Sequence, residues 1–165
     1  MGSAGQIPVV AIVGRPNVGK STLFNRLTEA RHAIVEDMPG VTRDRQYGEA
    51  DILGRHVIVV DTGGFEPVSD DVLLKQMREQ AEIAIDEADA ILCVLDGPAG
   101  VLPQDAEIVR MLARSKKPVF WVVNKIDGPR HDPLVAEFYE LGIGPLYPIS
   151  AQHAGGTLDL IEAVF

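Results

Sequence analysis

Residues 14–21 could surround a phosphate group. They read Gly-Arg-Pro-Asn-Val-Gly-Lys-Ser and fit the pattern G-x-x-x-x-G-K-[ST]. An apolar run (residues 8–13) precedes them and a helical pattern (residues 21–27) follows. In such a strand–loop–helix turn, inward-facing backbone N–H groups and the start of the helix attract phosphate oxygens. Lys20 adds a positive charge for the outer phosphates, so this segment predicts a phosphate site without identifying the nucleotide.

A second group of residues has the chemistry to hold a magnesium ion beside such phosphates. The Ser21 hydroxyl can bind the metal directly, and Asp61, which follows an apolar run, can act through a water. Thr42, in the segment Pro-Gly-Val-Thr-Arg-Asp, is the third expected ligand. Gly64 has no side chain, so its N–H can approach the outermost phosphate. Taken alone, Asp-Thr-Gly-Gly (residues 61–64) is equally compatible with an ordinary turn at a strand end.

A third group, Asn-Lys-Ile-Asp (residues 124–127) followed by Ser-Ala (residues 150–151), could select the base. The Asp127 carboxylate can accept from two donors on the guanine edge. Adenine lacks those donors and would leave the charge unpaired, which can reject it by about 10⁴-fold. Asn124 can bond the base and tie neighbouring loops together, the Lys125 stem can lie along the ring, and residues 150–151 can offer backbone N–H groups to the guanine carbonyl.

All the strand-linked segments follow apolar runs, so they are expected at the C-terminal strand ends, where open α/β sheets bind ligands. The expected catalytic residues are Lys20, Thr42, Gly64 and Asn17. The expected nucleotide contacts are Gly14, Arg15, Pro16, Asn17, Val18, Gly19, Lys20, Ser21, Thr22, Asp61, Thr62, Gly63, Gly64, Phe65, Asn124, Lys125, Asp127, Ser150 and Ala151.

The elements that must position these residues alternate along the chain. Five apolar runs predict buried strands at residues 9–13, 57–60, 91–95, 119–123 and 146–149. Residues 47–52 and the turn Leu53-Gly54 add one antiparallel strand at the edge. Helical patterns lie between most strands, the longest from Asp71 to Ala88, and residues 31–45 are expected to form a long loop. The prediction is an α/β fold with three layers and a mostly parallel six-stranded sheet.

Composition narrows the class of protein. The 165 residues suit one domain, and the longest apolar runs have strand length, so no membrane partner is expected. The net charge of −9 argues against this domain alone binding the phosphate backbone of a nucleic acid, because such binding needs a basic face. The single cysteine, Cys93, lies in an apolar run and is expected to be a small buried hydrophobe in a cytoplasmic protein.

The ordered motifs resemble the translation-factor-related GTPases, and the likeness tightens to the Era and EngA branch. Gly-Arg-Pro-Asn-Val-Gly-Lys-Ser-Thr-Leu-Phe-Asn-Arg-Leu (residues 14–27), Thr-Arg-Asp-Arg-Gln-Tyr-Gly (42–48) and Phe-Tyr-Glu-Leu-Gly (138–142) look like the first G domain of the EngA (Der) family. The resemblance implies a P-loop NTPase fold, GTP and GDP with Mg²⁺, and a role in large ribosomal subunit assembly. It also implies a second G domain and a KH-like domain, both absent here. Ala154 is a departure, since relatives are expected to have Gly there.

The resemblance leaves the domain limits and the rate of reaction to be predicted. Residues 1–6 are expected to be disordered or a remnant of expression, and residues 7–165 to be one G domain, monomeric alone, from a longer protein. Many GTPases place a water-orienting Gln where this chain has Phe65, so slow hydrolysis is expected. Relatives with Asn17 use K⁺ beside the phosphates, which implies stimulation by K⁺; alternatively, Asn17 only stabilises the turn. Arg43 and Arg45 are either catalytic or, in the favoured interpretation, contacts to solvent or a partner.

Several functions fit these residues. The first is an enzyme that converts GTP and water to GDP and phosphate. The second is a non-catalytic binding module, in which the bound nucleotide sets the conformation of residues 31–45 and 63–74 for a partner, the large ribosomal subunit or its precursor. A G domain of an Era-type or tRNA-modification GTPase is a related alternative. An ATP-using kinase would have no use for the guanine-selecting carboxylate of Asp127.

Overall fold

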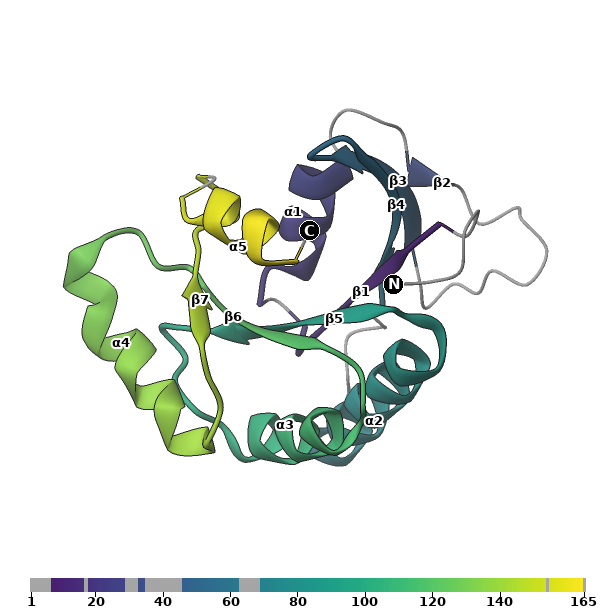
Figure 1. The fold of residues 1–165 in the computed structure, drawn as a ribbon. Helices are drawn as coiled ribbons and strands as arrows, with labels where there is room; N and C mark the ends of the chain where they lie inside the picture. Colours follow the sequence, from purple (N-terminus) through teal and green to yellow (C-terminus); the bar gives the residue numbers. More distant parts are fainter. Residues whose placement is uncertain are drawn as a thin grey trace.

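The computed structural model describes residues 7–16, 18–28, 33–34, 46–62, 69–153 and 155–164. One sheet lies between two layers of helices (Figure 1). The strands are β1 (Val9–Val13), β2 (Ala33–Ile34), β3 (Gln46–Ile52), β4 (Arg55–Asp61), β5 (Ala90–Asp96), β6 (Val119–Asn124) and β7 (Leu146–Pro148). The helices are α1 (Lys20–Thr28), α2 (Asp70–Glu87), α3 (Pro103–Arg114), α4 (Asp132–Glu137) and α5 (Thr157–Val164), with short 3-10 helices at Pro129–His131 and Phe138–Leu141.

The strands lie in the order β2-β3-β4-β1-β5-β6-β7. β1 pairs in parallel with β4 and β5, and β6 pairs in parallel with β5 and β7. Only β3, among the described strands, runs against its neighbours, β2 and β4. The predicted α/β fold, with six strands of which one is antiparallel, is confirmed. The structure adds β2 beyond β3 as a seventh strand, and its two residues are too few to leave a recognisable pattern in the sequence.

The hairpin between β3 and β4 follows the predicted tight turn. Leu53 and Gly54 have φ of 51° and 77°, and two consecutive residues with positive φ match the right-handed twist of a two-residue hairpin. This hairpin places the end of β4, and with it Asp61, beside the end of β1 in the register Ile12 to Asp61. The Asp61 carboxylate, a predicted magnesium ligand, thereby lies at the same edge of the sheet as the predicted phosphate loop.

Alternate residues of β1 face two separate hydrophobic cores. Ala11 and Val13 pack with α2 and α3, whereas Val10 and Ile12 pack with α1 and α5. Figure 1 shows the same division, with α2 and α3 below the sheet and α1 and α5 above it. Cys93 is only 2% exposed, and burial raises the pKa of its thiol. It is therefore the small buried hydrophobe that the sequence predicts.

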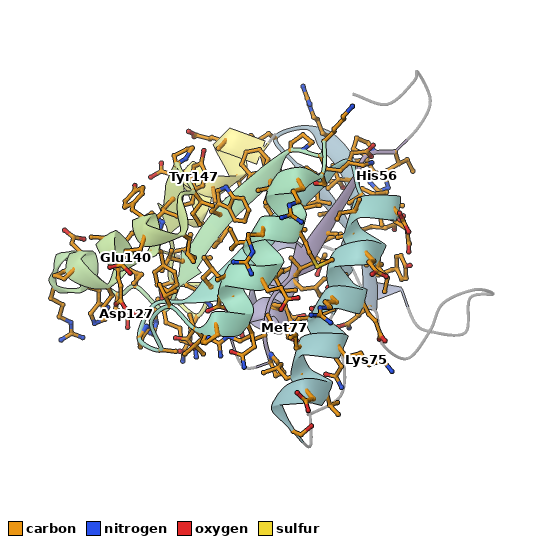
Figure 2. The ribbon with its side chains drawn as sticks, turned by 90° about the horizontal axis from the view of Figure 1, so that it is seen from below. His56, Lys75, Met77, Asp127, Glu140 and Tyr147 are labelled. Carbon is orange, nitrogen blue, oxygen red and sulfur yellow. The ribbon has the colours of Figure 1, made fainter. Side chains whose placement is uncertain are left out.

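Helix α2 is the longest of the described helices and covers the lower face of the sheet in Figure 1. It begins within one residue of the predicted start, where the Ser69 hydroxyl accepts a hydrogen bond from the backbone N–H of Val72 at 3.2 Å. Its Arg78 pairs with Glu107 of α3, which joins the two helices of this layer. Figure 2 shows Met77 on the side of α2 toward α3 and Lys75 on the outer side.

Some predictions concern residues outside the described part of the chain. These are the states of residues 1–6 and of most of the segment 31–45, of which only Ala33–Ile34 is described, as strand β2. Whether the chain is one domain of a longer protein also stays a prediction. Within the described residues, no helix combines the length and apolar composition needed to cross a membrane.

Candidate nucleotide-binding site

The predicted phosphate loop connects β1 to α1. β1 ends at Val13 and α1 begins at Lys20, and the Gly19 carbonyl accepts the N–H of Leu23 at 3.0 Å, so the loop leads directly into the first helical turn. The first N–H groups of a helix have no acceptor within the helix, so the start of α1 can offer them to a phosphate held by the loop.

Lys20 is held inside this loop. Its Nζ donates to the backbone O of Gly14 at 2.6 Å and to Gln80 Oε1 at 3.2 Å. The side chain is only 6% exposed, and this burial lowers the pKa of Lys20 to about 8, while the nearby Asp61 acts in the opposite sense. The ammonium is thus mostly charged at neutral pH and poorly solvated, so a phosphate oxygen is a strongly favoured partner.

Ser21 and Asp61 meet at the predicted metal position. The Ser21 hydroxyl donates to Asp61 Oδ2 at 3.2 Å, and Asp61 is 5% exposed. A hydroxyl beside a carboxylate is a donor set that Mg²⁺ accepts, and Mg²⁺ takes its remaining ligands from waters and substrate phosphates. In the described part of the chain, no three His, Cys, Asp or Glu side chains are grouped closely enough to hold a metal alone. The residues therefore fit a magnesium ion that binds together with phosphates.

Asn124, at the end of β6, joins the phosphate loop to the predicted base-binding loops. Its Nδ2 donates to the backbone O of Val18 at 2.8 Å, and its Oδ1 accepts the N–H of Ala151 at 2.9 Å. Gly19 lies against the same amide, since a Cβ on Gly19 would be 2.1 Å from Asn124 Nδ2. The predicted tie between neighbouring loops is present, and the buried amide fixes the distance between the two halves of the site.

A cavity of about 280 Å³ lies on the far side of Asn124. Its lining includes Gly19, Thr22, Asn124, Lys125, Asp127 and Ser150, all predicted nucleotide contacts, together with Pro98, His131 and Gln152. Lys125 donates from Nζ to Asp96 Oδ2 at 2.7 Å, which leaves its stem along the wall of the cavity. Figure 2 places Asp127 at the end of the molecule opposite His56, so the cavity lies at the C-terminal edge of the parallel strands.

Asp127 has polar partners for both its carboxylate and its backbone N–H. Ser150 Oγ donates to Asp127 Oδ1 at 3.0 Å, and the Asp127 N–H donates to His131 Nδ1 at 3.0 Å. The backbone N–H groups predicted to meet a base carbonyl have acceptors in this structure: Ala151 donates to Asn124, and Ser150 donates to the O of Gly155 at 2.8 Å. Contact with the guanine carbonyl therefore requires exchange of one of these acceptors and stays a prediction.

Two predicted nucleotide contacts turn their side chains away from the loop. Arg15 Nε pairs with Asp105 Oδ1 of α3 at 3.0 Å, because that carboxylate is 3% exposed and requires a cation. Burial raises the pKa of Asp105, and Arg15 opposes that rise. The Thr62 hydroxyl donates to the Ile12 carbonyl at 2.7 Å, inside the sheet. The Arg15 and Thr62 side chains thus have protein partners in this structure, and contact of either residue with the nucleotide stays a prediction.

Other side chains at the site were not foreseen. Gln80 reaches the loop from α2, and Arg26 of α1 donates to the carbonyls of Ala151 and Gln152. Gln80 left a signal in the sequence, since it lies three residues after Met77 and four before Ala84, on the apolar face of α2. Arg26 and His131 left none, because their partners come from loops whose paths only the fold defines.

Some predicted site residues lie outside the described part of the chain. They are Asn17, Thr42, Gly63, Gly64 and Phe65, together with Arg43 and Arg45. Their roles stay predictions.

Comparison with known proteins shows which family the chain resembles. Residues 9–125 match the family described as a 50S ribosome-binding GTPase. The chain is 60% identical over 158 residues to GTPase Der of Geobacter metallireducens, which covers 96% of this chain and 36% of that protein. The chain thus spans little more than a third of that relative's length. The likeness to the EngA (Der) family predicted from the motifs is confirmed.

Solved structures show the same arrangement of elements. A variant of Era from Aquifex aeolicus, bound to GDP and AlF₄⁻, has a TM-score of 0.74 and 36% identity, covering 96% of this chain and 56% of that chain. Era in complex with MgGDPNP and a segment of 16S ribosomal RNA has a TM-score of 0.74 and 38% identity, with the same coverage.

Proposed function

The chain belongs to the 50S ribosome-binding GTPase family, and from that premise we propose that it binds GTP and GDP with Mg²⁺, hydrolyses GTP slowly and acts as a nucleotide-dependent switch in assembly of the large ribosomal subunit. The observation that carries this proposal is the position of Asn124. One amide bonds the phosphate loop through Val18 and the base-side loop through Ala151. A phosphate site and a base cavity held at a fixed spacing fit a nucleotide better than they fit a free phosphate or a free base.

Asp127 supports guanine as the base. Asp127 lines the cavity, its carboxylate accepts from Ser150, and its backbone N–H donates to His131. A carboxylate accepts hydrogen bonds only, and guanine offers an N–H and an amino group on one edge, whereas adenine does not. The Era structures that resemble this chain hold GDP with AlF₄⁻ and MgGDPNP. GTP is therefore the proposed substrate, and an ATP-using kinase is the less favoured alternative.

Hydrolysis at this site would depend on positioning and charge, with no covalent intermediate. The loop residues from Gly14 to Gly19 and the start of α1 hold the phosphates, and Lys20 offsets the charge that develops on the outer ones. Ser21 and Asp61, with Thr42, would hold a magnesium ion, which supplies further positive charge when bound. The N–H of Gly64 is proposed to meet the γ-phosphate.

The rate of this reaction is proposed to be low, because Phe65 stands where a Gln would orient the attacking water. A K⁺ ion held by Asn17 is proposed to supply part of the missing charge, since an amide oxygen suits a hard monovalent cation. We expect GTP hydrolysis to rise severalfold when K⁺ replaces Na⁺ at constant ionic strength, and Asn17→Ala to remove the gain. Phosphate release in the two salts measures this, and equal wild-type rates would reject the K⁺ site.

A longer protein would supply the partners. Because the chain spans 36% of a curated relative, a second G domain and a KH-like domain are proposed to lie in the rest of the protein, and RNA contacts are assigned to those parts. The net charge of −9 supports that division, since an acidic domain repels RNA backbone. The proposed location is cytoplasmic, and the isolated domain is proposed to be a monomer. We also propose that Arg43 and Arg45 contact solvent or a partner and are not catalytic.

The experiment that tests this function combines turnover with partner binding. Phosphate release from GTP is measured with and without large ribosomal subunits, and co-sedimentation with those subunits is compared in GDP and in a non-hydrolysable GTP analogue. A switch predicts tighter co-sedimentation of the longer protein in one nucleotide state. GTP turnover with equal co-sedimentation in both nucleotide states would support the enzyme and contradict the switch. Co-sedimentation that depends on nucleotide without any turnover would favour the non-catalytic binding module.

A further inference from the structure

Gln80 is a buried polar residue on the apolar face of α2. Gln80 is only 4% exposed. It lies between Met77 and Ala84 on the face of α2 that packs against the sheet. Figure 2 shows Met77, three residues earlier, on the side of this helix toward α3. A buried amide is costly unless it is hydrogen-bonded, so the groups around Gln80 are informative about its role.

Three donors converge on the amide oxygen. Gln80 Oε1 lies 3.2 Å from Lys20 Nζ, 3.3 Å from Thr62 Oγ1 and 3.4 Å from the N of Gly14. Thr62 has one hydroxyl hydrogen, and the Ile12 carbonyl accepts it at the shorter distance of 2.7 Å. The lysine ammonium and the Gly14 N–H are therefore the donors that depend most on Gln80. One amide from α2 thus contacts both the first residue of the phosphate loop and its charged side chain.

The ammonium of Lys20 has three hydrogens to place. Gly14 O accepts one at 2.6 Å and Gln80 Oε1 accepts a second at 3.2 Å. With two directions fixed by protein acceptors, the third N–H has one remaining direction. A phosphate oxygen can take it without any protein contact being broken, so the arrangement prepares Lys20 for its ligand in advance.

We propose that Gln80 is a positioning residue for Lys20: its amide oxygen, delivered by α2, aims the lysine ammonium at the phosphates of the bound nucleotide. This inference rests on the proposed binding of GTP and GDP. It adds a contact between α2 and the phosphate loop that does not pass through the Asp-Thr-Gly-Gly segment. Any displacement of α2 along its axis would then move the acceptor and weaken the hold on Lys20.

The neighbouring Gln76 provides a matched comparison. It lies one turn before Gln80 on the same helix, and its Oε1 is buried with no hydrogen-bond partner among the residues that the structure describes. The two residues share side-chain type and helix, and they differ in contact with Lys20. Gln76→Met is therefore expected to leave nucleotide affinity unchanged, whereas Gln80→Met keeps the length of the side chain and removes the amide, with its acceptor oxygen and its NH₂ donors.

The test measures GDP and GTP dissociation constants by titration of a fluorescent nucleotide. Gln80→Met is expected to weaken both by about tenfold, the size typical of a hydrogen bond to a charged group. In a Lys20→Met background, Gln80→Met should change affinity by less than about twofold, because the two residues act as one unit. Urea unfolding checks that each variant is folded.

The outcomes separate the explanations. If Gln80→Met and Gln76→Met bind equally well, the amide oxygen of Gln80 does not position Lys20 and the proposal is wrong. An equal loss from Gln80→Met with and without Lys20 would also overturn it. If wild-type protein binds neither GDP nor GTP, the proposed function itself fails, and that result is distinguishable from all of these.

Discussion

Asp127→Asn is expected to exchange a preference for guanine for a preference for xanthine. The Asp127 carboxylate offers acceptors to the cavity, and an Asn side chain replaces one of them with an NH₂ donor. Guanine would then face donor against donor at its amino group, whereas xanthine has a carbonyl there that accepts. The variant loses the charged hydrogen bonds between Asp127 and guanine, and the guanine amino group is left without an acceptor. We expect this to lower GTP affinity by about 10³-fold. XTP affinity is expected to rise by a similar factor, measured by competition against fluorescent GDP.

The controls for this prediction separate base recognition from folding. Asp132→Asn, an exposed substitution at the start of the neighbouring helix α4, removes the same charge and is expected to bind GTP as the wild type does. Excess ATP should compete poorly with GTP in both the wild type and Asp132→Asn. If Asp127→Asn lowers GTP and XTP affinity equally, Asp127 supports the loop without reading the base. Effective competition by ATP in the wild type would instead favour the kinase alternative.

The motifs could be predicted because each one is local. Strand, loop and helix are consecutive from Val9 to Thr28, so spacing alone places Lys20 and Ser21 on one side of the loop. The same holds for Asp61, Asn124 and Asp127, because each follows a buried run whose direction in a parallel sheet is fixed. The fold class followed from the alternation of these runs with helical patterns, and the structure agrees with it.

The remaining details depend on contacts between distant residues. Gln80 meets Lys20 across 60 positions, and Arg15 meets Asp105 across 90, so no local pattern encodes either pair. Arg15 was assigned to the nucleotide because it lies inside the phosphate motif. Its actual direction is set by a buried carboxylate on α3, which the motif does not include. Sequence therefore locates the candidate site, while the fold decides which protein groups its side chains contact.

Gly19→Ala is expected to have the second large effect, because it acts on Asn124 at the joint between the two halves of the site. Gly19 has φ of 101°, and a Cβ there would lie 2.1 Å from Asn124 Nδ2. The side chain of Asn124 cannot remain where it is, so its bonds to Val18 and Ala151 are lost together. We expect GDP affinity to fall by at least about 100-fold, since two buried hydrogen bonds of about 1–2 kcal/mol each are broken and the spacing of the site is released.

Gly54→Ala is the matched control for Gly19→Ala. Gly54 also has a positive φ, 77°, but a Cβ there has nothing within 4 Å. It therefore carries the backbone strain of a left-handed alanine, about 1 kcal/mol of unfolding free energy, without any overlap. Its GDP affinity should equal that of the wild type, while urea unfolding shows the strain. If Gly19→Ala matched Gly54→Ala in both measurements, the contact between Gly19 and Asn124 would not hold the site together, and the phosphate loop and base cavity would act as independent binding sites.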